Sequence, residues 1–566
     1  MSEFRAATLR SAVRARVDQA WRDAVAAGAL PSVPAGEAAP EVEIARPGDP
    51  NHGDFATNLA LKLARSMRRS PLVIAGALAE ALRSQVAADG PDGALLATVE
   101  VAPPGFLNVR LTAHALEAAL DRARAAGPGF GRVPATTPRH VNVEFVSANP
   151  TGPLHIGNAR GAFVGDLLCR VLEGAGHRVT REYYFNDFGA QVRNLGASVL
   201  AMASGGTVPE DGYRGAYVAD LAAELPAEIR ARAMAPGADG ARVVGTWASE
   251  RVREGIEASL EHLGVHFDVW KTEGSLYGEG WVEKAIARLW NAGHVYVKDG
   301  ATWFSSMAFG DDKDRVIRKS NGEFTYFAAD IGYVTEKFSR GFDQLIYIWG
   351  ADHHGTVARV RNAAAAMGYD VDAVEMLLMA WVRFVRDGVE ISMSKRAGEF
   401  ITLDELLAEI GVDAARWFFA ARGHTVGIDF DIELAKKQSA ENPVYYVQYA
   451  HARIASILRK ATEAGLAPAA SLAGSLSGDP VATGLAGQVA RLPEVVEDAA
   501  SAEETQGLTA YATELATTFH AYYRDRRVVD PADPATSAAR LALVDACRVA
   551  LAATLGLLGI SAPESM

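Results

Sequence analysis

The sequence predicts an α/β protein built around a doubly wound parallel sheet, with a smaller α+β domain before it and an all-helical bundle after it. Between residues 140 and 435, short β-branched or aromatic runs alternate with helical patterns, which is typical of parallel strands joined by crossover helices. The chain before this region mixes helical and strand-like runs, and the chain after it is helical throughout. A length of 566 residues has room for roughly three to four domains.

The first segment, residues 1–121, opens with an arginine-studded amphipathic helix. Ser70 and Pro71 are expected to be the N-cap and the first position of a later helix. Two strand-like runs, LATVEVA and GFLNVRLT, complete the segment. The Gly- and Pro-rich residues 122–139 are predicted to form a linker.

The middle segment, residues 140–435, contains four strand candidates, VNVEFVS, FTYFAADI, QLIYIWGAD and VEISM. A polar, alanine-rich stretch at about 200–262 interrupts the alternation and is predicted to be a helical insertion. In the last segment, residues 436–566, Asn442 and Pro443 supply an N-cap and a first-turn proline, and a helical bundle is predicted to follow.

Composition excludes several classes of protein. The two cysteines, Cys169 and Cys547, are far apart, which excludes a CxxC zinc module and a disulfide framework. No apolar run approaches the ~18 residues of a membrane helix, and the N-terminus lacks a signal peptide, so a cytoplasmic protein without a membrane partner is expected. The net charge of −13 argues against a generic nucleic-acid binder, so any polynucleotide must be held by local basic patches.

The run NPTGPLHIGNARG, residues 149–161, lies where a strand candidate turns into a helical pattern. In a doubly wound sheet ligands bind at such a turn, where the helix start offers N–H groups and positive dipole to a phosphate. Gly152 and Gly157 allow close backbone approach. The run is neither a Walker loop nor a GxGxxG fingerprint, which disfavours a plain ATPase or dehydrogenase. His155 fits a structural role and a phosphate-binding role about equally well.

A second motif, EISMSKRAGEF, residues 390–400, predicts a short strand followed by a loop rich in hydroxyls, glycine and adjacent cations. Such a loop can grip phosphate, although a Lys–Arg pair alone usually just faces water. Thr402 and Glu405 are expected to form the capping box of the next helix. Together in one domain, the two motifs indicate a split phosphate site.

HIGN and SMSKR resemble the HIGH and KMSKS signatures of class I aminoacyl-tRNA synthetases. Over almost the whole chain the sequence resembles arginyl-tRNA synthetases, most clearly in VEFVSANPTGPLHIGNARGAFVGD, YYFNDFGAQ, TYFAADIGY, IYIWGADHHGTVARV and GISAPESM. The resemblance implies a Rossmann-like catalytic domain at 140–435, an N-terminal domain at 1–121 for the tRNA elbow and D-loop, and an anticodon-binding bundle at 436–566. The implied enzyme is a ligase that activates L-arginine with ATP and transfers the arginyl group to the terminal adenosine of tRNA(Arg).

Adenylate formation is an in-line attack on the α-phosphate, so catalysis is expected to consist of positioning and charge neutralisation. The resemblance implies that His155 donates to the phosphates, that Gly157 makes room for adenosine, and that Lys395 grips the β and γ phosphates. The implied catalytic residues are His155, Asn158 and Lys395, and the implied ATP-binding residues are Pro153, His155, Gly157, Asn158, Ser394, Lys395 and Arg396. Mg²⁺ is expected to arrive with ATP, and no protein-bound metal is expected.

Several positions depart from the family pattern. Asn158 replaces the second histidine of HIGH, and its amide can donate a hydrogen bond but cannot become cationic. Ser392 and Arg396 replace the first lysine and the final serine of KMSKS, whereas the second lysine is kept as Lys395. Family members that lack this lysine resemble one another in carrying a compensating lysine just before HIGH, where this chain has Gly152. The expected cation is therefore the one in the loop.

A guanidinium ligand favours planar carboxylates and neutral acceptors in a dry pocket. The resemblance implies an arginine pocket with the residues Glu144, Asn149, Tyr326, Asp330, Asp352 and His353, the first four at strand ends beside the first motif. A strand-end salt bridge or a helix cap is the alternative for Glu144 and Asp330. The sequence GADHHG also suggests a metal, but neighbouring residues on a strand point to opposite faces, which weakens that interpretation.

Binding of tRNA is assigned to the two flanking segments. Aromatic and cationic side chains can stack on unpaired bases and contact phosphates, and the candidates are Tyr445, Tyr449, Arg453, Arg524 and Arg526. Core packing is an equally good explanation for any single tyrosine. In the N-terminal segment the candidate phosphate contacts are Arg5, Arg10, Arg14, Arg16, Arg65, Arg68 and Arg69. The family further implies a monomer that needs tRNA before it activates arginine.

Two alternatives compete with this interpretation. Another class I synthetase is the first: a cysteinyl enzyme would need zinc-ligand cysteines, which the chain lacks, and the valine, leucine and isoleucine enzymes carry a large editing domain for which it has no room. A catalytically silent paralogue that binds tRNA or arginine would have no use for His155, Gly157 and Lys395 together, which argues against it.

Overall fold

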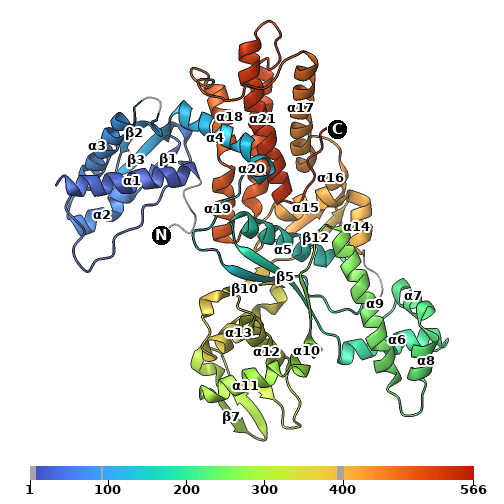
Figure 1. Ribbon diagram of the computed structural model, residues 1–566. Coiled ribbons are helices and arrows are strands. Elements are labelled where there is room, and N and C mark those ends of the chain that lie inside the picture. Colours follow the sequence, from blue (N-terminus) through green and yellow to red (C-terminus); the bar gives the residue numbers. More distant parts are fainter. Residues whose placement is uncertain (1–7, 91–92, 392–400) are drawn as a thin grey trace.

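The computed structural model describes residues 8–90, 93–391 and 401–566 (Figure 1). Its centre is a five-stranded parallel sheet of order β11-β10-β4-β5-β6. The strands are β4 (His140–Glu144), β5 (Arg178–Phe185), β6 (Val269–Thr272), β10 (Gln344–Gly350) and β11 (Val374–Met379). The chain enters at β4, extends to β6 on one side and later to β11 on the other, so the strand order reverses between β4 and β10. This confirms the predicted doubly wound sheet.

Helices cover both faces of the sheet. Successive residues of β10 belong to different cores: Ile346 lies in the core shared with α5 (Ile156–Gly174) and the C-terminal bundle, whereas Leu345 and Tyr347 lie in the opposite core. That second core is covered by α12 (Tyr326–Ser339) and α13 (His354–Ala366). Because both faces are buried, β10 has an almost continuous apolar sequence rather than an alternating one.

The strand predicted for FTYFAADI is wrong, because Tyr326 begins helix α12. The helix is buried around most of its circumference, between the sheet and its neighbouring helices, so its first turns carry aromatic and alanine residues without a polar stripe. A short apolar run of this kind cannot be distinguished from a buried strand by periodicity. The prediction from VEISM also fails in part: β13 (Val389–Glu390) pairs antiparallel with β12 (Val382–Arg386), outside the parallel sheet.

Two groups of elements interrupt the sheet. The helical insertion begins before the predicted residue 200 and contains α6 (Ala190–Ala203), α7 (Ala216–Glu224), α8 (Ala227–Ala233) and α9 (Gly240–His262). A second lobe follows β6, with α10 (Glu273–Gly278), α11 (Trp281–Asn291), and a sheet formed by β7 (Val295–Lys298), β8 (Ala301–Phe304) and β9 (Arg315–Arg318). Figure 1 shows these two lobes hanging from the same side of the parallel sheet.

The N-terminal domain is α+β, as predicted. It contains α1 (Leu9–Ala26), α2 (Leu59–Met67), α3 (Pro71–Asp89) and an antiparallel sheet of β1 (Phe55–Thr57), β2 (Leu96–Ala102) and β3 (Phe106–Leu111). Ser70 is the N-cap of α3 and Pro71 its first residue, as expected. Helix α4 (Ala113–Ala126) contacts the C-terminal bundle, and the first five residues of the expected linker 122–139 continue this helix.

The sheet is joined to the C-terminal bundle by a small domain of β12, β14 (Ile428–Asp431), α14 (Leu403–Ile410), α15 (Val412–Ala420) and α16 (Ile432–Lys436). The bundle consists of α17 (Pro443–Glu463), α18 (Pro480–Ala490), α19 (Leu492–Ala502), α20 (Gln506–Asp525) and α21 (Pro534–Leu557). Asn442 caps α17 as predicted, accepting from the Val444 N–H at 3.3 Å. No helix in the described parts of the chain is long and apolar enough to cross a bilayer.

Candidate active site

The first motif forms the turn between β4 and α5, at the point where the strand order reverses. His155 is the N-cap of the 19-residue helix α5, and its backbone N–H donates to Oδ1 of Asn158 at 3.2 Å. Asn158 therefore closes the first turn of the helix by accepting a hydrogen bond. The sequence suggested only a donor at this position, and the capping role follows from the helix boundary.

Two glycines in α5 are explained by close approach. A Cβ on Gly157 would stand 2.8 Å from Cε1 and Nδ1 of His155, so any side chain there would displace the imidazole. A Cβ on Gly165 would stand 2.3 Å from the ring of Phe145, which lets the helix lie close against the end of β4. The glycine at position 157 therefore determines where the His155 ring lies.

The backbone just before the motif has an unfavourable conformation and is held in place by a side chain from the neighbouring strand β5. Val146 and Ser147 both adopt positive φ, of 67° and 43°, which is a rare conformation for residues other than glycine and especially for a β-branched one. The buried hydroxyl of Tyr183 accepts from the Ala148 N–H at 3.0 Å and donates to the Ala148 carbonyl at 2.9 Å. Strained backbone of this kind clusters at functional sites.

Asn149 is oriented by two partners. Its Oδ1 accepts from the N–H of Asn186 at 3.3 Å, and its Nδ2 donates to Gln191 at 2.8 Å. The amide oxygen keeps one lone pair beyond the Asn186 bond, and the amide nitrogen keeps one hydrogen. Asn149 can therefore offer one acceptor and one donor, in a defined orientation, to a ligand at the edge of the sheet.

The residues that follow the second motif are bonded to the first motif. The Ile156 N–H donates to the Ile401 carbonyl at 3.2 Å, and the Leu403 N–H donates to the Leu154 carbonyl at 2.9 Å. These bonds pair residues 154–156 with residues 401–403 on either side of His155. Thr402 caps α14 in a capping box with Glu405, as predicted. Ser394, Lys395 and Arg396 lie outside the described residues.

Arg160 joins α5 to the far edge of the sheet. Its side chain is 1% exposed and donates to the carbonyls of Ala380 at 2.8 Å and Gly423 at 2.7 Å. Burial lowers the pKa of its guanidinium from the usual range. The carboxyl end of β11 is thereby held beside the first turns of α5, and the segment from β12 to residue 391 starts there.

Glu144 lies at the end of β4, where the sequence predicted it, but it has a cation partner within the protein. Its Oε2 accepts from Nζ of Lys337 at 2.7 Å in a fully buried ion pair, and its Oε1 accepts from the Ser147 hydroxyl at 3.1 Å. The strand-end salt bridge, the alternative to a ligand role, is therefore present. Glu144 therefore contributes negative charge at the end of β4, and both of its carboxylate oxygens already have hydrogen-bond partners within the protein.

Tyr326 and Asp330 do not lie at strand ends as predicted, because both belong to the first turns of α12. The correction brings them together, since residues four apart share one face of a helix. Tyr326 is 77% exposed. Burial, reinforced by Glu273 and Glu144 and opposed by Arg359, raises the pKa of the Asp330 carboxyl to about 7.

Glu273, which the sequence did not single out, is the second acid at this place. It is 5% exposed at the start of α10, and Tyr184 of β5 hydrogen-bonds to its side chain. Burial and Asp187 raise the pKa of Glu273 to about 7, against the effect of the Tyr184 bond. Its signal in the sequence is weak, because Glu273 follows Thr272 as an ordinary first-turn acid of a short helix.

Asp352 and His353 lie at the carboxyl end of β10, at the same edge of the sheet, and both are exposed. His353 Nε2 is 3.7 Å from Asp352 Oδ2, and its ring centroid is 5.5 Å from that of Trp349. These residues form a 3₁₀ turn rather than a strand, so the strand-based argument against a metal does not apply to them. Within the described residues, no group of three or more His, Cys, Asp or Glu is arranged to hold a metal ion.

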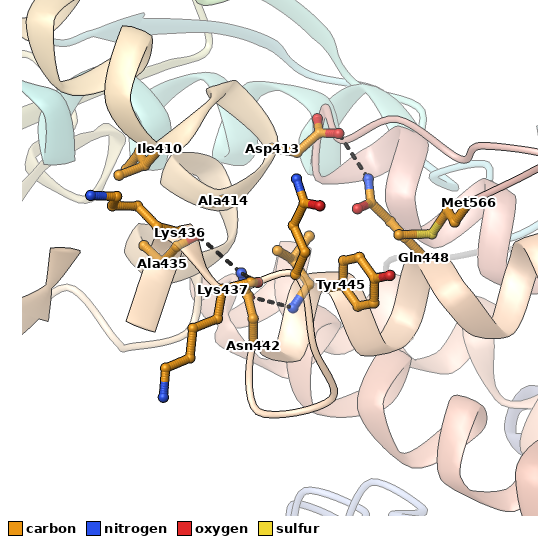
Figure 2. Close-up of a pocket in the computed structure, with 12 residues that line it drawn as sticks. Ile410, Asp413, Ala414, Ala435, Lys436, Lys437, Asn442, Tyr445, Gln448 and Met566 are labelled. Atoms are coloured by element: carbon orange, nitrogen blue, oxygen red, sulfur yellow. Dashed lines mark hydrogen bonds between the residues drawn. The ribbon is translucent and has the colours of Figure 1, made fainter. Parts of the chain in front are cut away.

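A separate cavity of about 360 Å³ lies between α16 and the start of α17 (Figure 2). Its lining includes Lys436, Lys437, Tyr445 and the C-terminal Met566. Asn442 anchors the wall by donating to the carbonyls of residues 435 and 437. Tyr445 thus faces a polar cavity in place of the bundle core, and the two lysines of its lining are paired with Glu409, Glu433 and Glu441. The sequence missed the two lysines and Met566, which only the fold brings to this place.

The other predicted contacts of the bundle differ among themselves. Tyr449 is 41% exposed, and the Arg453 guanidinium lies 5.7 Å from its ring centroid and 4.7 Å from that of Tyr523. Arg524 is exposed beside Asp525. Arg526 instead makes a two-pronged ion pair with Asp479, the N-cap of α18, so the fold already accounts for it.

The arginines of the N-terminal domain also divide into two groups. Arg10 pairs with Glu497 and Asp498 of α19, and Arg16 pairs with Asp89, so these two hold the protein together. Three others, Arg65, Arg68 and Arg69, are exposed, and so are the apolar side chains of Leu72, Val73 and Phe106. The turn before Phe106 packs against the start of α3, because a Cβ on Gly105 would stand 2.6 Å from Pro71. Arg5 lies outside the described residues.

A helix N-terminus at the switch point of a parallel sheet suits a phosphate-bearing ligand. Here the residues that follow the SMSKR run are bonded to that helix start, an arrangement that fits the catalytic domain of a class I aminoacyl-tRNA synthetase. Comparison with known families agrees. Residues 129–419 match the family of "tRNA synthetases class I (R), catalytic domain", residues 9–111 the "Arginyl tRNA synthetase N terminal domain", and residues 447–566 the "DALR anticodon binding domain".

Known proteins are similar over nearly the full length. The arginine–tRNA ligase of Syntrophotalea carbinolica is 44% identical over 93% of this chain and 95% of its own, and that of Moorella thermoacetica is 45% identical over 93% and 94%. The solved structure of Thermus thermophilus arginyl-tRNA synthetase superposes with a TM-score of 0.74 at 24% identity, covering 98% of this chain and all of the other. The chain belongs to the arginyl-tRNA synthetase family.

Proposed function

We propose that this chain is an arginine–tRNA ligase that works through the residues described above: it activates L-arginine with ATP to arginyl-adenylate and transfers the arginyl group to the terminal adenosine of tRNA(Arg). The observation that carries the proposal is the pairing of residues 154–156 with residues 401–403 around His155. It sets the residues that directly follow the second motif beside His155, which supports a split ATP site that a protein that only binds tRNA or arginine would not need. The whole-length family match supports the reaction.

The ATP site is assigned to the start of α5 and to the second motif, which directly precedes Ile401 in the sequence. The helix N-terminus supplies N–H groups and positive potential, and His155 donates to the phosphates as negative charge develops on them. Lys395, with Ser394 and Arg396, neutralises the β and γ phosphates, and the substrate is the Mg²⁺ complex of ATP. Pro153 and Gly157 leave room for the nucleoside. Asn158 acts through His155, whose backbone it holds.

The arginine site is assigned to the acids between α10, α12 and β4. Asp330 and Glu273 have raised pKa values because each is buried near other acids, which marks a place where a bound cation is favourable. A guanidinium fits there, since it is planar, always charged and can donate to both acids. Glu144, although bonded to Lys337, adds to the negative potential.

The remaining predicted residues surround this position. Asn149 is assigned to the α-amino and carboxylate end of the substrate, because its oriented amide offers one acceptor and one donor. Tyr326, one helical turn before Asp330, is assigned to the mouth of the site. Asp352 and His353 are assigned to its outer rim, on the carboxyl end of β10.

The tRNA contacts are assigned to two surfaces. An unpaired anticodon base stacks on Tyr445 in the cavity of Figure 2, with Lys436 and Lys437 near its phosphates and Tyr449 and Arg453 farther along α17. Arg524 is kept as an outer phosphate contact. In the N-terminal domain, the exposed surface formed by Arg65, Arg68, Arg69, Leu72, Val73 and Phe106 suits the tRNA elbow, where stacked bases and phosphates adjoin. This assigns the domains 1–121 and 436–566 to tRNA binding and the domain 140–435 to catalysis.

We infer that the protein is a cytoplasmic monomer.

The test is ATP–pyrophosphate exchange with each amino acid, with and without tRNA(Arg). Exchange with arginine alone among the amino acids, and only after addition of tRNA, is the expected result. Lys395→Ala should abolish it while the melting temperature stays unchanged, and Lys298→Ala, an exposed lysine of β7 outside the assigned ATP, arginine and tRNA surfaces, should keep it. Binding of tRNA without any exchange would refute the proposal in favour of a silent paralogue.

A further inference from the structure

The helical insertion contacts the first motif at two points. Tyr217, in the first turn of α7, donates its hydroxyl to the carbonyl of Thr151 at 3.0 Å. Its ring lies against Gly152, where a Cβ would stand 3.3 Å from Cζ and the hydroxyl oxygen. From α6, Gln191 accepts from the Asn149 amide at 2.8 Å. Two helices of the insertion therefore hold the two ends of residues 149–152.

The insertion provides a firm support for these contacts. Helices α6 and α9 pack at the distance that only glycine allows, since a Cβ on Gly196 would stand 1.9 Å from the Ala241 carbonyl oxygen and 2.6 Å from the Cα of Gly245. The segment that leads to α7 is joined to α6 through the Tyr213 N–H, which donates to the Ser198 hydroxyl at 2.9 Å. Tyr217 is thus attached to a close-packed helical pair.

The motif itself depends on outside support. Val146 and Ser147, just before it, have left-handed backbone conformations, which persist only when the surroundings over-determine them. Downstream, residues 154–156 are held by residues 401–403. Between these restraints, Thr151 and Gly152 are buried, and Tyr217 is the side chain whose hydroxyl bonds to the Thr151 backbone.

We propose that Tyr217 is a positioning residue for adenylate formation: it fixes Thr151 and Gly152 and thereby the place of His155 relative to the bound phosphates. This rests on the proposed function of the ATP site. Tyr217 touches no reacting atom in this role. It acts through the turn, so its removal lowers the rate of the chemical step more than the affinity for tRNA, because a displacement of about 1 Å can cost on the order of 10²-fold in rate.

The same ring has a consequence for the compensating lysine of related enzymes. In this chain the corresponding position is Gly152, and the Tyr217 ring fills the space beside it. A Cβ placed there already requires the ring to shift by a few tenths of an ångström, which would weaken its contact with the turn. Gly152→Lys is therefore expected not to rescue Lys395→Ala while Tyr217 is intact.

The experiment compares wild type, Tyr217→Phe, Tyr217→Ala and the control Tyr213→Phe, which removes a hydroxyl from the same insertion. The measurements are kcat and KM for ATP and arginine in tRNA-dependent pyrophosphate exchange, tRNA affinity and melting temperature. Loss of the hydroxyl should lower kcat about 3- to 10-fold, since one net hydrogen bond is involved. Loss of the ring should lower it about 10²-fold. Affinity for tRNA should stay within about twofold of wild type, and the control should resemble wild type in every measurement.

A double-mutant comparison separates positioning from general damage. If Tyr217 acts through His155, Tyr217→Ala should cost much less in a His155→Ala background than in wild type. Equal costs in the two backgrounds, or an unchanged kcat in Tyr217→Ala, would overturn the proposal, as would rescue of Lys395→Ala by Gly152→Lys. Tyr217→Phe provides the kinetic test if Tyr217→Ala fails to fold. Wild-type exchange tests the proposed function independently of these outcomes.

Discussion

Arginine binding is expected to depend on pH through Asp330 and Glu273. Both carboxyls have a pKa of about 7, raised by burial and by neighbouring acids, so each is about half ionised at pH 7 and about one-tenth ionised at pH 6. A guanidinium binds the ionised forms. The Kd for arginine should therefore rise as the pH falls below 7, by about tenfold per unit if one carboxylate must be ionised and about a hundredfold if both must.

The assay is a titration of arginine binding from pH 5.5 to 8.5 in the presence of tRNA(Arg). Glu273→Gln should remove one of the two proton dependences and flatten the slope. The control Glu279→Gln changes an exposed acid at the end of the same helix and should leave the slope intact. A Kd that is independent of pH in wild type would refute the assignment of these acids to the guanidinium.

The same shifts predict the opposite trend for the ligand-free protein. A carboxyl whose pKa is higher in the folded than in the unfolded state stabilises the fold at low pH, and this contribution is lost as the pH rises from about 4 to about 7. The positive charge of bound arginine offsets the unfavourable energy of the two ionised, buried acids. The rise in melting temperature caused by arginine should therefore be larger at pH 8 than at pH 6. An equal rise at both values would contradict this reasoning.

Three further predictions concern single side chains. His155→Ala should lower the exchange rate by about 10²–10³-fold, as removal of one oxyanion donor does in other enzymes, and should leave the melting temperature unchanged. A loss of less than tenfold would contradict the role assigned to His155. Asn158→His should be tolerated because a ring nitrogen can accept the hydrogen bond from the His155 N–H. Asn158→Ala loses this cap and should cost about 1 kcal/mol in the free energy of unfolding, measured by denaturant titration. Equal behaviour of the two variants would contradict the capping role. Tyr445→Ala should raise the Kd for tRNA by about 5- to 150-fold and Tyr445→Phe should not, as measured by filter binding; unchanged affinity in both would exclude stacking.

Much of the site was predictable because its chemistry is local in sequence. The cap at Asn442, the capping box at Thr402 and the turn after β4 each depend on a few adjacent residues, and the structure places all three as expected. The residues of the first motif are adjacent for the same reason, since a helix N-terminus and the turn before it bind phosphate with consecutive backbone groups.

The errors arose where burial hides periodicity. Helix α12 was mistaken for a strand because a helix enclosed by its neighbours has no polar face. Tyr326 and Asp330 were expected at strand ends, but they lie one turn apart on helix α12, so helical spacing is what brings them together. β13 was expected in the parallel sheet but pairs with β12, because strand pairing depends on residues distant in sequence.

By itself the sequence determined the fold class and the family, and it supplied the two motifs to which phosphate binding is assigned, all of which depend on short runs of residues or on whole-length similarity. Only the tertiary structure decided what surrounds them: the Lys337 partner of Glu144, the second acid Glu273, the cavity beside Tyr445 and the support from Tyr217. The physical reason is that pKa shifts, buried ion pairs and close packing are set by groups within a few ångströms of one another in space. Glu144 and Lys337, for example, lie 193 residues apart in sequence.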